Sequence, residues 1–335
     1  MDAQETKQSG EQASSAIQSS SQGERSCEPS ASSANFLKTK SRIRITDLRE
    51  AKLRKERWAM LTSYDSVSAK IFDCAKIPCI LVGDSAAQTV YGQKSTIPIT
   101  VDELLPLARA VSSSCQRALV IGDLPFGSYQ ESPEQALRTA VRFMKESQVH
   151  GVKLEGGKHF AAHVALLSKS GVPVMAHIGF TPQSEHALGG YKVQGRTLRA
   201  LDGLLGDALE LQEAGAFACV LELVPPEVGK IITERLNIPT IGIGAGPHCD
   251  AQILVWHDMA GFTAPRGLGA GYLSDLAKGA GDSNSSVGEN QLELNRVPKF
   301  VKRYANMSEI LFQAATTYAN EVEAGVYPAE EHCYD

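Results

Sequence analysis

Residues 79–84 read CILVGD, residues 118–123 read ALVIGD and residues 151–155 read GVKLE. Each run is apolar along most of its length and ends in an acidic residue, and none alternates polar with apolar residues as a half-exposed strand does. Continuous apolar runs of this kind are typical of parallel strands that are buried on both faces of a sheet. The three runs therefore predict strands of a parallel sheet.

Further runs of the same kind bring the number of predicted strands to eight. They are Trp58–Thr62, Pro173–Gly179, Cys219–Leu223, Thr240–Gly244 and Ile253–Trp256. Helix-like segments lie between the strands, among them Val101–Ser114, Pro133–Lys145, Leu198–Ala214 and Pro226–Leu236. Strands that alternate with helices predict βαβ units. Eight such units in roughly 250 residues are typical of a (β/α)8 barrel, and a doubly wound sheet is the alternative.

Two stretches stand apart from this pattern. Most of residues 1–42 is rich in Ser and Gln and poor in large apolar residues, so a disordered N-terminal extension is expected there. Residues at about 263–296 are rich in Gly and Ser and predict a flexible insertion. The remainder of 43–335 is expected to form a single barrel that ends with a C-terminal helix over Met307–Val326.

Charge and cysteine content limit the class of protein. The chain has 33 basic and 38 acidic residues, a net charge of -5, which argues against a general nucleic-acid-binding surface. No apolar run approaches the roughly 18 residues that a membrane span needs. The seven cysteines form no CxxC pair, so neither a zinc ribbon nor a disulfide scaffold is expected. These features predict a cytoplasmic protein with reduced thiols and with neither nucleic-acid nor membrane partners.

Three consecutive predicted strands end in acidic residues, namely Asp84, Asp123 and Glu155. In a (β/α)8 barrel the carboxyl ends of the strands form the active-site face, so these side chains would converge on one mouth. Three oxygen ligands with no thiolate nearby suit a hard cation, with Mg²⁺ favoured over Mn²⁺. The alternative for each Asp is a helix N-cap or an ordinary loop residue.

Two further charged residues lie on predicted strands. Lys153 is two positions from Glu155, so both side chains would face the same mouth, where a lysine can hold a substrate carboxylate or oxyanion. Glu222 lies within the apolar run Val220–Val224, where desolvation is expected to raise its pKa toward that of a general base. The alternatives are a solvent-facing lysine and a structural partner for an arginine or for backbone N–H groups.

Two other patterns could suggest different chemistry. His159 and His163 stand at i and i+4 on a predicted helix, which could suggest zinc, but no HExxH motif is present and a solvated helix face is expected. Residues 242–246 read GIGAG, which lacks the third spaced glycine of a dinucleotide-binding loop and lies late in the chain. Close approach of the backbone to a ligand is the favoured interpretation of these glycines, and a nicotinamide-dependent oxidoreductase is disfavoured.

Several motifs, taken together and in chain order, resemble the ketopantoate hydroxymethyltransferase family. They are VGDS at 82–85, DLPF at 123–126, VKLEGG at 152–157, HIGFTPQS at 177–184, GGYKVQGR at 189–196, GIGAG at 242–246 and GVYP at 325–328. The similarity runs from about residue 43 to 262 and resumes at 297–304. Each motif alone is weak, and their shared order makes the resemblance specific.

The resemblance implies a (β/α)8 TIM barrel of the phosphoenolpyruvate/pyruvate type and a particular reaction. A hydroxymethyl group would pass from 5,10-methylenetetrahydrofolate, the co-substrate, to 3-methyl-2-oxobutanoate through a Mg-stabilised enolate. The product would be 2-dehydropantoate, on the route to pantothenate and coenzyme A. The family forms homo-oligomers, often decamers, so the resemblance implies the same here.

The resemblance also implies roles for individual residues. Asp84, Asp123 and Glu155 correspond to the Mg²⁺ ligands, and Glu222 corresponds to the general base. Asp84, Ser85, Asp123, Lys153 and His177 correspond to substrate-binding residues. Two alternatives from other classes remain: a Mg-dependent 2-oxoacid lyase or aldolase on the same barrel, and a non-catalytic barrel that serves in binding or assembly.

Overall fold

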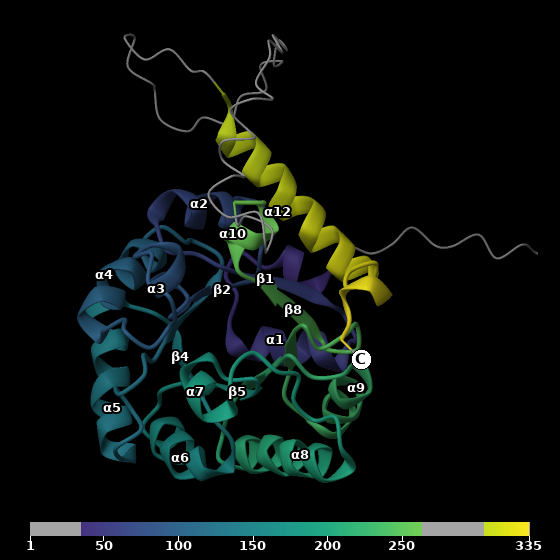
Figure 1. Ribbon diagram of the computed structural model, residues 1–335. Coiled ribbons are helices and arrows are strands. Elements are labelled where there is room, and N and C mark those ends of the chain that lie inside the picture. Colours follow the sequence, from purple (N-terminus) through teal and green to yellow (C-terminus); the bar gives the residue numbers. More distant parts are fainter. Residues whose placement is uncertain (1–34, 263–304, 335) are drawn as a thin grey trace, which may run out of the picture. The chain divides into compact units, whose positions relative to one another are not determined.

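The computed structural model describes residues 35–262 and 305–334. In this part of the chain eight strands, all parallel to their neighbours, close into a barrel in the order β1 to β8 (Figure 1). The predicted (β/α)8 barrel is therefore confirmed. The predicted insertion at 263–296 and the predicted extension up to residue 34 lie outside the described residues.

The strands match the predicted runs to within a few residues. They are β1 (Trp58–Thr62), β2 (Cys79–Val82), β3 (Leu119–Asp123), β4 (Gly151–Glu155), β5 (Val174–Gly179), β6 (Ala218–Glu222), β7 (Thr240–Ile243) and β8 (Ala251–Leu254). The largest displacement is in β8, which begins two residues before the predicted start at Ile253. Barrel closure explains it, because β8 pairs along its length with β1, and the Trp256 N–H then donates to Thr62 Oγ1 at 3.0 Å, where the next helix begins.

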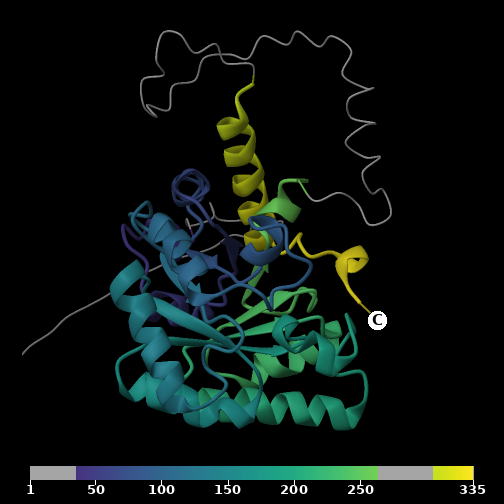
Figure 2. The ribbon, with the colours of Figure 1, turned by 60° about the vertical axis from the view of Figure 1, so that its left-hand side comes forward.

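Helices surround the closed sheet in Figures 1 and 2. They are α1 (Ile45–Leu53), α2 (Ser66–Cys74), α3 (Ala86–Thr89), α4 (Val101–Ser112), α5 (Pro133–Arg142), α6 (Ala161–Lys169), α7 (Glu185–Leu188), α8 (Leu198–Glu213), α9 (Pro226–Arg235), α10 (Trp256–Met259) and α12 (Met307–Ala324). Short 3₁₀ or π turns occupy Phe36–Thr39, Phe143–Ser147, Lys158–Phe160, Pro182–Ser184 and Glu330–His332. No helix among the described residues has the length and hydropathy of a membrane span.

Local signals explain where the main helices begin. Thr100 and Glu103 form a reciprocal capping box before α4, and the Ser132 hydroxyl accepts from Gln135 N–H while Pro133 fills the first turn of α5. Such caps satisfy backbone N–H groups that have no partner inside the helix. The helix starts predicted at Val101, Pro133, Leu198 and Pro226 are all confirmed.

The barrel interior changes from apolar to polar along the strands. Alternate residues face inward, and the inward positions near the amino ends of the strands carry buried apolar side chains such as Met60, Ile121 and Ile241. Two residues further along, the same inward face of β3 carries Asp123 in register with Lys153 of β4. The period of two therefore fills the barrel interior with apolar side chains and places a polar cluster at the carboxyl ends of the strands.

Residues at both ends of the described chain pack on the barrel. Phe36–Thr39, within the region expected to be an extension, form a 3₁₀ turn whose Leu37 is buried. The buried Arg117 guanidinium donates to the carbonyl oxygens of Leu37 and Lys40, which holds this segment in place. On α12, the Tyr318 hydroxyl donates to the Gln252 carbonyl oxygen of β8 at 2.8 Å.

Candidate active site

A cavity of about 750 Å³ opens at the carboxyl ends of the strands. Its walls include all seven residues that the sequence predicts for the site: Asp84, Ser85, Asp123, Lys153, Glu155, His177 and Glu222. They come from β3, β4, β5 and β6 or from the turn that follows β2. The structure therefore brings together residues that are up to about 140 positions apart in the chain, because parallel strands all end at one face of the barrel.

The three predicted metal ligands form one buried cluster. Asp84, Asp123 and Glu155 each offer a carboxylate oxygen, and these oxygens lie within 4.8 Å of one another. Within residues 35–262 and 305–334 this is the one group of three or more candidate ligand side chains with that spacing. Burial and the neighbouring carboxylates raise the pKa of Asp84 well above its usual value, since like charges in a desolvated site oppose ionisation. A divalent cation among these oxygens would remove that repulsion, so the residues present fit a hard metal ion.

Lys153 supplies positive charge at the base of the cluster. Its Nζ lies 2.9 Å from Asp123 Oδ1 and 3.4 Å from Glu155 Oε1, and its side chain is buried. Burial alone would lower the pKa of Lys153, but Asp123, Glu155 and Asp84 outweigh it and raise that pKa, so the ammonium stays charged. The alternative of a solvent-facing lysine is wrong, because Lys153 occupies an inward position of β4.

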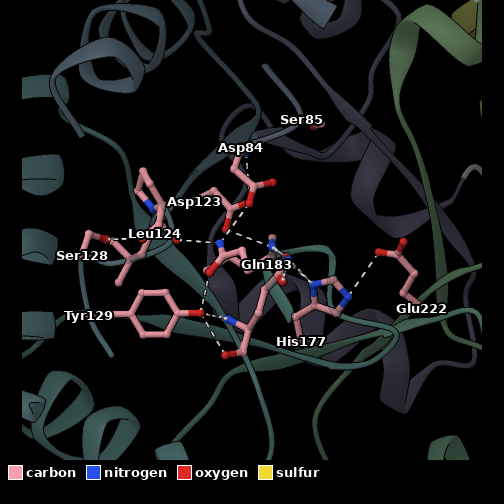
Figure 3. Close-up of polar contacts among 12 residues, drawn as sticks. Asp84, Ser85, Asp123, Leu124, Ser128, Tyr129, His177, Gln183 and Glu222 are labelled. Carbon is pink, nitrogen blue, oxygen red and sulfur yellow. Dashed lines mark hydrogen bonds and ion pairs between the residues drawn. The ribbon is translucent and has the colours of Figure 1, made fainter. Parts of the chain in front are cut away.

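His177 lies between two carboxylates (Figure 3). Its Nδ1 is 3.3 Å from Glu155 Oε1, and its Nε2 is 3.3 Å from Glu222 Oε2. Burial and the Lys153 charge oppose protonation, but the two carboxylates prevail and raise the pKa of His177 to about 9. Lys153 and His177 also lower the pKa of Glu155 to about 2 against the effect of burial. Lys153, Glu155 and His177 therefore form a compact set of opposite charges.

Glu222 ends β6 and borders the cavity. Its side chain is 12% exposed, whereas Glu155 is 2% exposed, so Glu222 is the carboxylate of the site that keeps contact with the open space. Among the described residues, its ion-pair partner is the His177 imidazole, whereas the structural alternative called for an arginine or backbone N–H groups. Ser85 also lines the cavity, and its Oγ lies 2.8 Å from the Tyr64 hydroxyl, which fixes that serine at the start of α3.

Two residues that the sequence singled out for no role also contact this cluster. The Gln183 side chain donates to Asp84 Oδ2 at 2.9 Å, and the Tyr129 hydroxyl lies 2.7 Å from Gln183 Oε1. Gln183 belongs to the HIGFTPQS motif, but a glutamine in a turn after a strand usually has no functional role. Its position in one of the motifs that carry the family resemblance was the one available signal.

Of the two other patterns that could suggest different chemistry, neither His163 nor Gly242 lines the cavity. His163 is buried, so the predicted solvated face is wrong for this residue; its ring packs edge-on against Phe160 with centroids 4.9 Å apart. Gly242 allows close packing within the barrel, because a Cβ there would lie 2.9 Å from Gln252 Oε1. The close approach expected at this glycine is thus to the neighbouring strand.

A closed (β/α)8 barrel whose carboxyl-end cavity holds three carboxylates, a lysine and a histidine defines the class: a barrel with a charged cavity of the kind in which enzymes of this fold bind small ligands. Comparison with known proteins identifies the family. The model of the ketopantoate hydroxymethyltransferase family matches residues 42–330, and the chain belongs to that family.

Curated relatives agree with this assignment. The 3-methyl-2-oxobutanoate hydroxymethyltransferase of Saccharopolyspora erythraea is 53% identical over 294 residues, covering 88% of this chain and 90% of the relative. The Thermobifida fusca enzyme of the same name is 52% identical over 293 residues, with coverage of 88% and 94%.

Solved structures with the same barrel share little sequence. Phosphonopyruvate hydrolase in complex with oxalate and Mg²⁺ has a TM-score of 0.52 at 13% identity, covering 71% of this chain and 88% of the other. Phosphoenolpyruvate phosphomutase from Streptomyces platensis subsp. rosaceus has a TM-score of 0.51 at 15% identity, with coverage of 70% and 88%. The predicted family is confirmed, and these structures share the fold of the predicted barrel.

Proposed function

We propose that this chain transfers a hydroxymethyl group from 5,10-methylenetetrahydrofolate to 3-methyl-2-oxobutanoate, giving 2-dehydropantoate for pantothenate and coenzyme A biosynthesis. Two relatives named 3-methyl-2-oxobutanoate hydroxymethyltransferase, each more than 50% identical over most of the chain, support the activity. The observation that carries the proposal is the convergence of the carboxylate cluster, Lys153, His177 and Glu222 on one cavity.

Asp84, Asp123 and Glu155 would hold Mg²⁺, with Mn²⁺ as a substitute. The similarity of fold to a protein solved in complex with oxalate and Mg²⁺ supports a cation, since oxalate resembles the carboxylate and keto oxygens of a 2-oxoacid. When bound, the metal would act as a Lewis acid that stabilises the enolate oxyanion of the substrate. With Glu222 the site has four carboxylates against two cationic side chains, and the difference of two charges equals the charge of one divalent cation.

The chain's own residues would bind the ketoacid and move its proton. Lys153, Ser85 and His177, with Asp84 and Asp123, line the wall where the carboxylate and keto oxygen would lie. Apolar residues of the same cavity, including Leu81, Val220 and Ile253, suit the branched hydrocarbon end of 3-methyl-2-oxobutanoate. Glu222 would take the proton from C3, and the resulting carbon nucleophile would form a bond to the one-carbon unit. One water molecule would supply the hydroxyl oxygen as both carbon–nitrogen bonds of that unit break and tetrahydrofolate leaves.

One assay tests this proposal. The purified full chain is given 3-methyl-2-oxobutanoate and Mg²⁺, with and without methylenetetrahydrofolate, and 2-dehydropantoate is measured. Folate-dependent product supports the transferase. Folate-free cleavage of a carbon–carbon bond in another 2-oxoacid would instead support the lyase or aldolase alternative, which shares the carboxylate cluster. Full activity in EDTA would exclude the metal.

The same family membership supports further parts of the proposal. The chain is expected to act in the cytoplasm as a homo-oligomer, a decamer by family resemblance, with no nucleic-acid or membrane partner. Sedimentation velocity of the purified chain tests the oligomer directly, and a monomer at assay concentration would contradict it.

A further inference from the structure

Gln183, in the turn that follows β5, contacts the ends of the three strands that carry the carboxylate cluster. Its side-chain amide donates to Asp84 Oδ2 after β2 and to the carbonyl oxygen of Leu124, which follows Asp123 at the end of β3, both at 2.9 Å. Its backbone N–H donates to Glu155 Oε2 of β4 at 3.0 Å. Figure 3 shows this amide among the labelled residues of the site. One residue thus ties together the segments that bear all three carboxylates.

The hydrogen bonds define the orientation of the amide. The Leu124 carbonyl can only accept, so the nitrogen of the amide must face it, and the same nitrogen then faces Asp84. The oxygen faces the other way, where it lies 2.7 Å from the Tyr129 hydroxyl and accepts from Gln130 Nε2 at 3.2 Å. Every donor and acceptor of the Gln183 amide is therefore satisfied, and the side chain is 3% exposed.

Tyr129 extends this support to the backbone of Glu155. Its hydroxyl lies 3.0 Å from the Glu155 carbonyl oxygen and accepts from the Glu155 N–H at 3.2 Å. Tyr129 is also buried, and its ring packs edge-on against Phe160 with centroids 5.2 Å apart. Without the hydroxyl, the Gln183 oxygen would keep only the hydrogen bond from Gln130. The Glu155 backbone at the end of β4 would also lose its contacts with Tyr129.

We propose that Gln183 is a positioning residue that presets the carboxylate cluster for its cation, with Tyr129 as its support. This inference rests on the proposed function, because it takes the cluster to be a metal site. Three carboxylates within 4.8 Å repel one another, and a donated hydrogen bond keeps Asp84 from rotating away. Groups that orient metal ligands in this way commonly change metal affinity by about 10- to 100-fold when they are replaced.

The test measures cation binding without catalysis. The full chain is stripped with EDTA and dialysed, and Mn²⁺ is titrated while the signal of the free ion is followed by electron paramagnetic resonance. Gln183→Met keeps an unbranched side chain of similar length but removes both donors, so it should weaken Mn²⁺ binding by roughly 10- to 100-fold. Tyr129→Phe should weaken it by a smaller factor, because it acts through Gln183.

Gln130→Met is the matched control. Gln130 contacts the Gln183 oxygen but no carboxylate of the cluster, and its own oxygen accepts from the Gly127 N–H at 2.7 Å. It should bind Mn²⁺ like the wild type. Melting temperatures in EDTA separate a loss of fold from a loss of positioning, and if Gln183→Met does not fold, Tyr129→Phe decides.

The outcomes separate this inference from the proposed function. Wild-type affinity in Gln183→Met, or in Tyr129→Phe where that variant decides, would overturn the positioning role while leaving the metal site intact. A wild-type chain that binds no Mn²⁺ would overturn the metal site and the positioning role together. An equal loss in Gln130→Met would also overturn the inference, because it would show a general loosening of the turn.

Discussion

His177 Nε2 lies 3.3 Å from Glu222 Oε2, so the imidazole holds the carboxylate that we propose as the base. The other ring nitrogen lies 3.3 Å from Glu155 Oε1 of the carboxylate cluster. A single side chain thus joins the position where a proton would be removed to the position where a cation would lie. With a pKa of about 9, the ring carries a positive charge at neutral pH, which suits a contact with two carboxylates.

Glu222→Gln should abolish exchange of the substrate C3 proton. The amide is close in shape to the carboxylate but cannot accept the proton, and loss of a general base commonly lowers a rate by about 10²- to 10⁴-fold. Exchange into D2O is followed by proton NMR of 3-methyl-2-oxobutanoate with Mg²⁺. Binding of the ketoacid, measured by calorimetry, should survive. Normal exchange in this variant would remove Glu222 as the base.

Asp123→Ala should weaken the binding of Mg²⁺ and the binding of the ketoacid together. Asp123 is 1% exposed and pairs with Lys153 at 2.9 Å, so its loss removes one proposed ligand and leaves a buried ammonium without its nearest partner. The Mg²⁺ concentration for half-maximal activity and the ketoacid affinity are measured in parallel. The exposed Asp202→Ala serves as the control. An unchanged Mg²⁺ requirement in Asp123→Ala would contradict the ligand assignment.

Gly179→Ala should impair both stability and turnover. Gly179 has φ +93°, and a Cβ there would overlap the carbonyl oxygen of Glu222, so the neighbouring strand end must shift. Gly171 has φ +84° but no heavy atom near the place of a Cβ, which makes Gly171→Ala the matched control. That control should cost about 1–2 kcal/mol from backbone conformation alone.

Thermal unfolding and turnover of both variants decide the matter. Gly179→Ala should lose more stability than Gly171→Ala, and it alone should lose turnover, because it alone lies against the backbone of Glu222. Equal effects of the two substitutions on both measurements would show that this close approach has no importance for the site.

His150 should make the fold less stable in mild acid. Burial and the adjacent Arg42 guanidinium lower the pKa of His150 from 6.5 to about 4, and the Val120 N–H donates to Nδ1 of the neutral ring at 2.8 Å. Because the folded pKa is the lower one, the stabilisation is complete above about pH 6.5 and is lost as the pH falls toward 4.

Denaturant unfolding across this pH range provides the measurement. The free energy of unfolding of the wild type should fall between pH 6.5 and 4. His150→Gln has no titrating group at this position, so its free energy should fall less over the same range. Parallel curves for the two proteins would contradict the prediction.

The strands and most of the site could be predicted because their signals are local. A continuous apolar run identifies a buried strand without knowledge of its neighbours, and the residue after that run must lie at the carboxyl end of the strand. This is why Asp84, Asp123 and Glu155 could be expected at one mouth once eight strands had been counted. The start of β8 was less accurate, because it depends on pairing with β1, almost 200 residues earlier.

Gln183 and His163 show what local patterns cannot supply. Gln183 and Asp84 are 99 positions apart, and no spacing indicates that an amide in a turn will face a carboxylate from another strand. His163 sits on a short helix whose buried side depends on what packs against it.

Local chemistry, namely apolar runs and the order of strand-end residues, therefore sufficed for the barrel and for the identity of its acidic cluster. Closure of the barrel decided the contacts within that cluster, the place of His177 between Glu155 and Glu222, and the support from Gln183 and Tyr129. The reason is physical: hydrogen bonds and charge pairs depend on distances of a few ångströms, and those distances exist only after strands far apart in the chain have paired.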